Sequence, residues 1–290
     1  MLRLSVIAVA AAIVATTCAG ATQSAAGTER HTVPRFRHVI LVVFENHEVN
    51  DVLGNSDAPT FNRLASRYAT VSNYTAVTHP SLPNYLALVS GATQGIDSDC
   101  TDCIVNGRSL ADTLAAARKT WKTYAEGLPS VGFTGASSGH YAKKHNPLVY
   151  FRGNLTPPRL QRIVPLTRFL PDVRARRLPT FSLIVPDLCH DIHDCGVSTG
   201  DSWLSSFLKP ILRGSVLTKS VVFVVFDEGD SDVGGGGRVA ALALGPLVRH
   251  HARSTVATNH YGLLRTIEAG LGLPLLGRSA GARPIVGIWR

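Results

Sequence analysis

Three continuous runs of apolar and aromatic residues constrain this chain more than any other feature of its sequence. They cover residues 38–44, 180–185 and 220–226. Runs of this length and composition are typical of strands that are buried on both faces of a parallel sheet. Each run ends in polar residues, and open α/β sheets build their sites beyond the carboxyl ends of their strands. We therefore predict an α/β fold with a mostly parallel central sheet flanked by helices.

Further elements follow from apolar periodicity and from caps. Asp201 is expected to cap a helix over residues 202–212. The other predicted helices cover 60–68, 110–117 and 258–269, and the other strands cover 70–74, 120–126 and 239–244.

Three further segments read as connections or as surface. Residues 129–158, rich in Gly, Ser and Pro, predict a long surface loop, and basic residues within 159–177 indicate a solvated helix face. The four glycines at 234–237 lack the spacing of a phosphate-binding loop, so we interpret them as a flexible connection.

A serine stands at the start of a predicted helix within residues 78–91. Pro83 suits the first turn, where a missing N–H removes nothing, and apolar residues from Tyr85 to Val89 can seat the helix on a core. Ser81 would then lie where free N–H groups and the positive end of the helix dipole meet an anion. The motif alone equally fits an ordinary helix cap.

Three carboxylates are expected to meet at the carboxyl edge of the sheet. Glu45 follows the first apolar run, and Asp227 with Glu228 follows the third. Close like charges in a low-dielectric place require a divalent cation or a shared proton, and we favour the cation. With Ser81 as a further ligand, such a cation would activate the hydroxyl and polarise a phosphoryl oxygen, as phosphoryl transfer requires. Ca, Zn, Mg and Mn all remain possible.

Histidines and amides supply the remaining chemical roles. An imidazole in a loop after an apolar segment can bind phosphate, ligate a metal or protonate a leaving group. The chain places five histidines in this way: His79, His145, His190, His193 and His260. Each is, taken singly, more often structural. Asn46 and Asn84 would hydrogen-bond substrate oxygens or serve as turn and cap residues.

The N-terminus predicts export. Residues 1–21 carry Arg3, an apolar run over 4–14 and a small-residue cleavage site, which together indicate a secretory leader. The run is short for a bilayer span, so no stable membrane insertion is expected once the leader is removed. Residues 22–35 are predicted to be disordered and residues 36–290 to form a single catalytic domain. The residues before Cys18 match a lipidation signal poorly, and its lipidation remains open.

Four other cysteines form two close pairs. In an exported chain, Cys100 with Cys103 and Cys189 with Cys195 predict two short-loop disulfides. A zinc site is the alternative, but matching Cys or His residues are absent beside Cys100. The formal charge of +9 favours anionic substrates or envelope polymers. No run of Lys and Arg interleaved with aromatics indicates nucleic-acid binding.

Six motifs in order resemble the phosphoesterase family of secreted acid phosphatases and phospholipases C. They lie at residues 44–47, 78–85, 144–147, 186–194, 226–228 and 259–261. The resemblance covers about residues 36–275 and implies an alkaline-phosphatase-like core. It also implies hydrolysis of phosphoric monoesters or diesters through a phosphoserine intermediate.

Carried over by motif, the resemblance implies particular roles. Ser81 would be the nucleophile, within a metal site formed by Glu45, Asn46, Ser81, Asp227 and Glu228. Asp191 is a weaker candidate for a second metal position. The substrate phosphate or the leaving group would be served by His79, Asn84, His145, His193, Asp194 and His260. The acids of residues 187–194 that face the site remain open, because Asp187 and His190 depart from the expected pattern.

We therefore expect a secreted or cell-envelope phosphomonoesterase that acts on small phosphate esters. The alternative enzyme is a phospholipase C or other phosphodiesterase, although the chain is short for that branch. The non-enzyme alternative is an envelope polymer-binding protein with a structural calcium site. The oligomeric state remains open.

Overall fold

The computed structural model describes residues 1–2, 32–212 and 214–290, and it confirms the predicted α/β class. Its main sheet has eight strands in the order β11-β2-β10-β9-β1-β8-β4-β7. Neighbouring strands pair in parallel except where β10 meets β9 and β2. The strands are β1 (Val39–Phe44), β2 (Ala69–Val71), β4 (Trp121–Ala125), β7 (Ile163–Pro165), β8 (Phe181–Val185), β9 (Val221–Phe226), β10 (Ala241–Leu244) and β11 (Ala252–Ser254).

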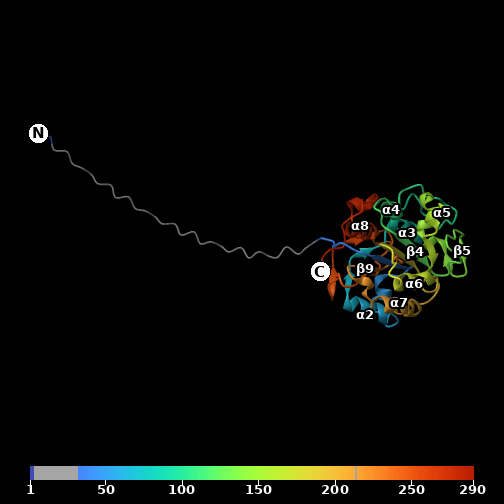
Figure 1. Ribbon diagram of the computed structural model, residues 1–290. Coiled ribbons are helices and arrows are strands. Elements are labelled where there is room, and N and C mark those ends of the chain that lie inside the picture. Colours follow the sequence, from blue (N-terminus) through green and yellow to red (C-terminus); the bar gives the residue numbers. More distant parts are fainter. Residues whose placement is uncertain (3–31, 213) are drawn as a thin grey trace.

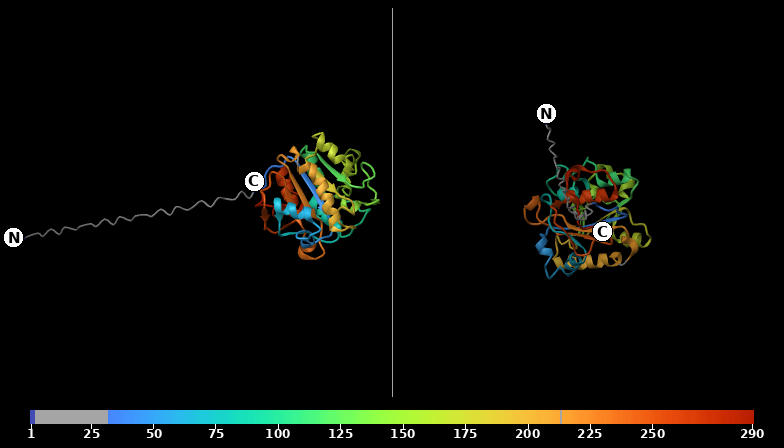
Figure 2. Two further views of the ribbon diagram at one scale, coloured as in Figure 1. Left: turned by 90° about the horizontal axis from the view of Figure 1, so that it is seen from below. Right: turned by 90° about the vertical axis from the view of Figure 1, so that its left-hand side faces the viewer.

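Helices cover both faces of this sheet, which gives three layers (Figure 1). One face carries α3 (Ser81–Ser90), α4 (Leu110–Ala116) and α8 (His260–Leu271). The opposite face carries α2 (Pro59–Arg67), α6 (Phe169–Arg174) and α7 (Val197–Leu212). The end-on view in Figure 2 shows the sheet between the two helical layers.

Short elements complete the chain. Two small sheets pair β3 (Tyr74–Thr75) with β12 (Thr258–Asn259) and β5 (Ser137–Ser138) with β6 (Tyr141–Ala142). The short helices are α1 (Val49–Val52) and α5 (Pro157–Leu160). The 3-10 turns are Lys143–His145, Pro147–Val149, Arg152–Asn154, Leu166–Arg168, Ser215–Leu217, Val233–Gly235 and Gly277–Gly281.

The centre of the sheet is dry, as the apolar runs predict. Every residue of β1 and β9 is buried, and the two strands pair in register from Val39 with Val221 to Phe44 with Phe226. Large side chains on both faces remove apolar area from water, which stabilises the layers on either side. Because the register is exact along six residues, the polar residues that follow the two strands emerge at the same height.

Two predicted elements need correction. The strand predicted over 70–74 is divided between β2 in the main sheet and β3 in a small sheet. Helix α7 begins at Val197, so Asp201 lies inside it and does not cap it. Its Oδ1 instead accepts hydrogen bonds from the backbone N–H groups of Thr60 (2.7 Å) and Phe61 (2.9 Å), at the start of α2. The cap acts between helices rather than within one.

The segment predicted as a long surface loop is at the surface over residues 129–140, but residues 145–151 are buried. Tyr150 and Phe151 are fully inaccessible, and the backbone there pairs with Val105 through two hydrogen bonds of 2.8 Å. The basic segment that follows contains strand β7, not only helix. Three-residue edge strands carry too little pattern to be predicted from a single sequence.

The prediction that the four glycines at 234–237 form a flexible connection is also wrong. A Cβ at Gly235 or Gly236 would collide with the backbone oxygens of Val77 and Thr78. Gly235 also has a φ of +106°, which L side chains rarely adopt. The loop is therefore close-packed against the segment that leads to Ser81.

The N-terminal predictions fall mostly outside the described residues. This holds for Cys18, for nearly all of the leader and for residues 22–31. Val33 is partly buried against the core, so packing begins before the predicted boundary at residue 36. Within the described chain, none of the helices combines the length and apolar character that crossing a bilayer requires. Both predicted disulfides are confirmed, Cys100–Cys103 and Cys189–Cys195.

Candidate active site

Ser81 is the first residue of α3 and lies in the centre of the predicted acid cluster. Only 1% of it is exposed, and its Oγ donates to Glu45 Oε2 at 2.8 Å and lies 3.2 Å from Glu228 Oε1. Glu45 follows β1 and Glu228 follows β9 by two residues, so strand register places both acids at one edge. The sequence prediction that this serine and these acids meet is confirmed.

Asp227 completes the cluster and is wholly buried. Its Oδ1 accepts from the backbone N–H groups of Asn46 (3.2 Å) and Glu228 (2.6 Å), whereas its Oδ2 has no hydrogen-bond partner in the described part of the chain. Burial, and then the charges of Glu45 and Glu228, raise the pKa of Asp227 well above its usual value. Asn46 has a left-handed backbone (φ 54°), which Asn tolerates and which turns the chain around this carboxylate.

These acids suit a divalent cation. Oε1 of Glu45 is a second buried carboxylate oxygen that accepts no hydrogen bond from the described residues, although the His145 ring forms an ion pair with it at 3.2 Å. Burial also raises the pKa of Glu228, although His79 acts against it. Repelling carboxylates with orphaned oxygens are stabilised when a cation binds between them. Glu45, Asp227, Glu228 and Ser81 Oγ are therefore a candidate set of hard oxygen ligands.

His145 forms a buried pair with Glu45. Its Nε2 lies 3.2 Å from Glu45 Oε1, and the Tyr85 ring stacks on it at 5.3 Å and 11°. Burial lowers the pKa of His145, but Glu45 and Asp191 outweigh it and raise the value to about 9. Burial also raises the pKa of Glu45, and His145 reverses this, to about 2. The pair is thus charged at neutral pH.

Asp191 orients this histidine rather than forming a separate metal position. Its Oδ2 lies 2.9 Å from His145 Nδ1, and its Oδ1 accepts from the His193 N–H at 2.9 Å. Burial raises the pKa of Asp191 to about 6. With both oxygens turned towards the two histidines, the second metal position expected at Asp191 has no support in the geometry.

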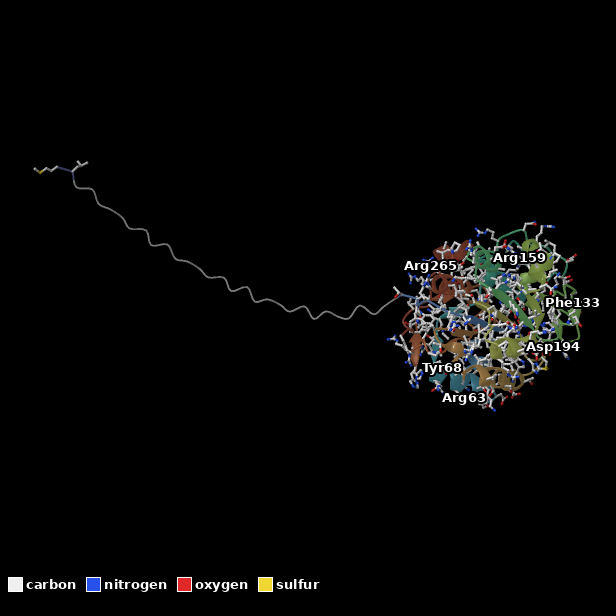
Figure 3. The ribbon with its side chains drawn as sticks, in the orientation of Figure 1. Arg63, Tyr68, Phe133, Arg159, Asp194 and Arg265 are labelled. Carbon is white, nitrogen blue, oxygen red and sulfur yellow. A yellow bond between two sulfur atoms is a disulfide. The ribbon has the colours of Figure 1, made fainter. Side chains whose placement is uncertain are left out.

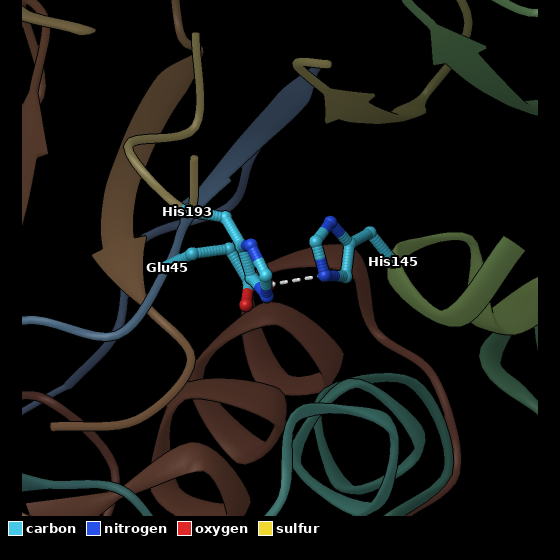
Figure 4. A group of neighbouring side chains, drawn as sticks. All are labelled: Glu45, His145 and His193. Atoms are coloured by element: carbon cyan, nitrogen blue, oxygen red, sulfur yellow. Dashed lines mark ion pairs between the residues drawn. The ribbon is translucent and has the colours of Figure 1, made fainter. Parts of the chain in front are cut away.

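His193 reaches the same pocket from the loop after β8. Asp194 Oδ1 lies 2.7 Å from His193 Nδ1 and so fixes the ring, while Asp194 itself lies at the surface (Figure 3). The ligand atoms of Glu45, His145 and His193 all lie within 4.8 Å of one another. Figure 4 shows Glu45 and His193 side by side, with His145 facing them. These three form a second candidate metal group that shares Glu45 with the first, although a metal could bind there only if the charged His145 gave up its Nε2 proton.

Asn84 does not bind substrate in the way the motif suggests. It is fully buried, and its Oδ1 accepts from the N–H groups of Val77 and Thr78. Its Nδ2 donates to the carbonyl oxygens of Thr78 and Pro80. All of its hydrogen-bonding groups therefore hold the turn that precedes Ser81.

His79 and His260 also brace the acids instead of facing an open pocket. His79 Nδ1 lies 2.6 Å from Glu228 Oε2 and its Nε2 lies 3.2 Å from the Ser231 carbonyl. His260 is fully buried between the Asp227 carbonyl (2.5 Å) and the Tyr74 hydroxyl (2.9 Å). Burial lowers the pKa of His260 to about 4, so the ring is neutral. The expected leaving-group role of His260 conflicts with this burial.

Three residues of the site were missed from the sequence. Tyr85 lies four residues after Ser81 on the same helix face, a spacing that would have revealed it. Lys144 Nζ lies 3.1 Å from His193 Nε2 and 2.9 Å from Asp99 Oδ2, and Asp99 accepts from the Leu82 N–H. The sequence carries no local signal for these long-range contacts.

A second acid–histidine cluster lies further along the same edge of the sheet. Glu126 Oε2 lies 3.0 Å from His190 Nδ1, and Asp187 Oδ1 lies 3.3 Å from the same nitrogen. All three side chains are half-exposed. This resolves the open question of residues 187–194: Asp191 and His193 face the serine, while Asp187 and His190 turn away.

A buried serine at a helix start, beside acids fit for a cation and a positioned histidine, defines a phosphoric ester hydrolase on an alkaline-phosphatase-like fold. Comparison with known proteins agrees. The phosphoesterase family matches residues 48–274, and the chain belongs to this family.

Curated relatives carry the same chemistry in their names. A phosphatidylinositol-3-phosphatase of Mycobacterium tuberculosis is 36% identical over 99% of this chain and 93% of its own length. A phosphate-repressible acid phosphatase of Penicillium chrysogenum is 32% identical over 75% of this chain. This chain spans only 55% of that fungal enzyme.

Solved structures support the fold. A protein of the alkaline phosphatase superfamily from Vibrio parahaemolyticus has a TM-score of 0.60 at 14% identity. The match covers 88% of this chain and 72% of the Vibrio chain. A lipoteichoic acid synthase from Listeria monocytogenes has a TM-score of 0.56 at 12% identity, over 87% of this chain and 75% of its own. At such identities the likeness concerns the fold alone.

Proposed function

We propose that this protein is a metal-assisted phosphomonoesterase that works through a phosphoserine at Ser81. One observation carries the proposal: the buried Ser81 Oγ hydrogen-bonds to Glu45 and lies beside Glu228 at the start of α3. A serine hydroxyl is a weak nucleophile unless its proton has an acceptor and its environment favours the alkoxide. The two carboxylates supply the acceptor, and the helix dipole favours the negative charge.

In the first half-reaction, Ser81 Oγ attacks phosphorus and the bond from phosphorus to the ester oxygen breaks. Glu228 accepts the serine proton, because burial raises its pKa and makes it the better base. His193 is held through Nδ1 by Asp194, and in the free protein its Nε2 accepts from the Lys144 ammonium at 3.1 Å. Once Lys144 has turned away and Nε2 has taken a proton from solvent, this nitrogen delivers that proton to the departing oxygen. The product alcohol leaves neutral and the phosphoryl group remains on Ser81.

In the second half-reaction, a water molecule attacks the phosphoserine from the side that the alcohol left. His193 Nε2 takes the proton of this water, and Ser81 Oγ recovers its own proton from Glu228 as the phosphorus–oxygen bond breaks. Phosphate is released and both residues return to their first protonation states. The same imidazole thus serves as acid and then as base.

A divalent cation would be held by Glu45, Asp227, Glu228 and the Ser81 hydroxyl, with Asn46 beside them. It supplies charge neutralisation at the phosphoryl oxygens and lowers the pKa of the serine. The buried His145–Glu45 pair fixes the orientation of the Glu45 carboxylate. His260 and His79 hold Asp227 and Glu228 in place from outside.

The substrate we propose is a small, soluble phosphoric monoester, as for the acid phosphatases among the relatives. We also propose an extracytoplasmic location, because two disulfides require an oxidising compartment. A second candidate is a phosphoinositide monoester, favoured by the relative that matches over nearly the whole chain. Rates on p-nitrophenyl phosphate, bis-p-nitrophenyl phosphate and phosphatidylinositol 3-phosphate vesicles separate monoester, diester and lipid substrates.

The nucleophile is tested with Ser81→Ala. We expect release of phosphate from p-nitrophenyl phosphate to fall at least about a thousandfold, while the circular dichroism spectrum stays unchanged. Acid quench of the wild type with a phosphate-labelled ester should leave label on a peptide that contains Ser81. Retained activity in the alanine variant would refute the assignment.

A further inference from the structure

A carboxylate, that of Asp99, lies against the start of α3, where the substrate phosphate would be expected. Asp99 lies in the loop that leads to the Cys100–Cys103 disulfide, and its Oδ1 accepts from the Leu82 N–H at 2.9 Å. Its Oδ2 accepts from Lys144 Nζ at 2.9 Å. Lys144 also contacts His193 Nε2 at 3.1 Å. A single anion thus engages a backbone donor and an ammonium directly beside the proposed nucleophile.

Leu82 has the backbone donor that a phosphoryl group on Ser81 would reach. It directly follows Ser81 in the first turn of α3, where N–H groups have no partner within the helix. Pro83, the next residue, has no N–H to offer. The Leu82 N–H is therefore one of few free donors in this turn, and in the free protein Asp99 occupies it.

Lys144 has the position and charge of a phosphate ligand. Its ammonium touches His193, the residue we assign to the leaving group, and its side chain is only 20% exposed. Carboxylate and phosphate are bound by the same charge-assisted contacts, and two phosphoryl oxygens can span the same pair of donors as two carboxylate oxygens. Asp99 and a phosphate dianion cannot share these donors, because like charges at such a distance repel.

We propose that Lys144 and the Leu82 N–H bind the substrate phosphate, and that Asp99 is a built-in competitor that phosphate displaces from both donors. The inference rests on the proposed function, since it concerns the same pocket. Asp99 has the freedom to leave: it lies in a loop, its side chain is 29% exposed, and water can take over its hydrogen bonds. In the free protein Asp99 neutralises the Lys144 ammonium and accepts the hydrogen bond of the Leu82 N–H at the start of α3.

The competition predicts opposite effects for the two partners. Lys144→Met removes a phosphate ligand, so the Kd for inorganic phosphate and the KM for p-nitrophenyl phosphate should both rise about tenfold. Lys144→Arg should recover most of this loss. Asp99→Asn removes the competing charge, so the Kd for inorganic phosphate should fall about three- to tenfold.

The experiment is calorimetric titration of the purified, metal-containing protein with inorganic phosphate, alongside the KM and kcat of each variant. Lys122→Met is the matched control, because Lys122 forms a comparable ion pair with Asp172 outside the pocket. If Asp99 only anchors Lys144 and the helix, Asp99→Asn will weaken phosphate binding, and the proposal is overturned. An unchanged Kd in Lys144→Met also overturns it.

This test does not depend on the nucleophile. Phosphate binding is measured without turnover, so it can be repeated in the Ser81→Ala background. If the serine assignment is wrong, Ser81→Ala will retain activity. If the Lys144 assignment is wrong, adding Lys144→Met to an inactive Ser81→Ala protein will leave its phosphate affinity unchanged. Thermal unfolding of each variant separates a lost fold from a lost ligand.

Discussion

The carboxyl edge of the sheet carries two clusters built from the same residue types, and they differ in burial. Glu45, His145 and His193 bring their ligand atoms within 4.8 Å of one another, and so do Glu126, Asp187 and His190. Glu45 and His145 are almost fully buried, whereas His193 and every member of the second cluster are partly exposed, with 16% to 35% of each side chain accessible. Among the described residues, a serine hydrogen-bonds to the first cluster only.

The comparison shows what turns an acid–histidine cluster into a candidate active site. Water can solvate the carboxylates of the exposed cluster, so its contacts contribute little and require no cation. In the buried cluster the same charges must be compensated by histidine, by a cation or by a proton. Spacing in the sequence is therefore less informative than the environment in which the residues end up.

The largest contrast is expected for one carboxylate from each region. Asp227→Asn removes a charge from the buried oxygen cluster, so hydrolysis of p-nitrophenyl phosphate should fall at least about a hundredfold. Metal content by elemental analysis should fall with it. Asp187→Asn should retain both activity and metal. Equal losses in the two variants would end the distinction between the clusters.

The two histidines of one loop should differ next. His193→Gln is expected to lower kcat for an alkyl phosphate about a hundredfold, because its leaving oxygen needs a proton. The loss should be smaller for p-nitrophenyl phosphate, whose leaving group departs as the anion. His190→Gln should change neither rate appreciably. A loss in His193→Gln that is the same for both esters would argue against its role as general acid.

Glu268 is a buried acid outside both clusters, so it shows the effect of burial on an acid that takes no part in the proposed reaction. Glu268 is fully inaccessible and accepts from Leu276 N at 2.9 Å and from Ser279 Oγ at 2.6 Å, and burial raises its pKa to about 7. Between pH 4.5 and 7 the folded protein keeps this proton and the unfolded chain loses it. Stability should therefore fall as pH rises through this window, by about 3 kcal/mol.

Glu268→Gln mimics the protonated acid and should remove this part of the pH dependence. Urea unfolding at pH 4.5 and pH 7 measures it, and the activity on p-nitrophenyl phosphate serves as the control. An unchanged pH dependence in the variant would mean that the folded protein does not raise the pKa of Glu268. A loss of activity without a loss of stability would show that Glu268 takes part in the reaction and does not affect stability alone.

The sequence predicts the parts of this molecule that depend on local pattern. The apolar runs of β1, β8 and β9 can only be buried strands, and residues that follow such strands must meet at one edge. The meeting of Ser81 with Glu45 and Glu228 follows from this rule and from the helix start.

The remaining features depend on contacts that no local pattern encodes. The two histidines on either side of Ile192, which has a φ of +79°, belong to different clusters: His190 lies with Glu126, and His193 lies with Glu45. Asn84 and His260 have the residue types of substrate ligands, but backbone groups occupy them: those of the preceding turn for Asn84, and the distant Asp227 carbonyl for His260. Tyr150 and Phe151 lie in a segment with loop composition and are nevertheless buried in the core.

The glycine loop has a consequence for how the pocket can move. Glu228 and Gly234–Gly237 belong to one connection between β9 and β10, and its backbone lies against Val77 and Thr78, just before the serine. Because the glycines have no side chains, the backbones of the two segments are in direct contact, and we expect them to move together. We therefore expect the nucleophile and its proton acceptor to shift together, and adaptation to substrates of different size to fall to the segments that carry Asp99, Lys144 and His193.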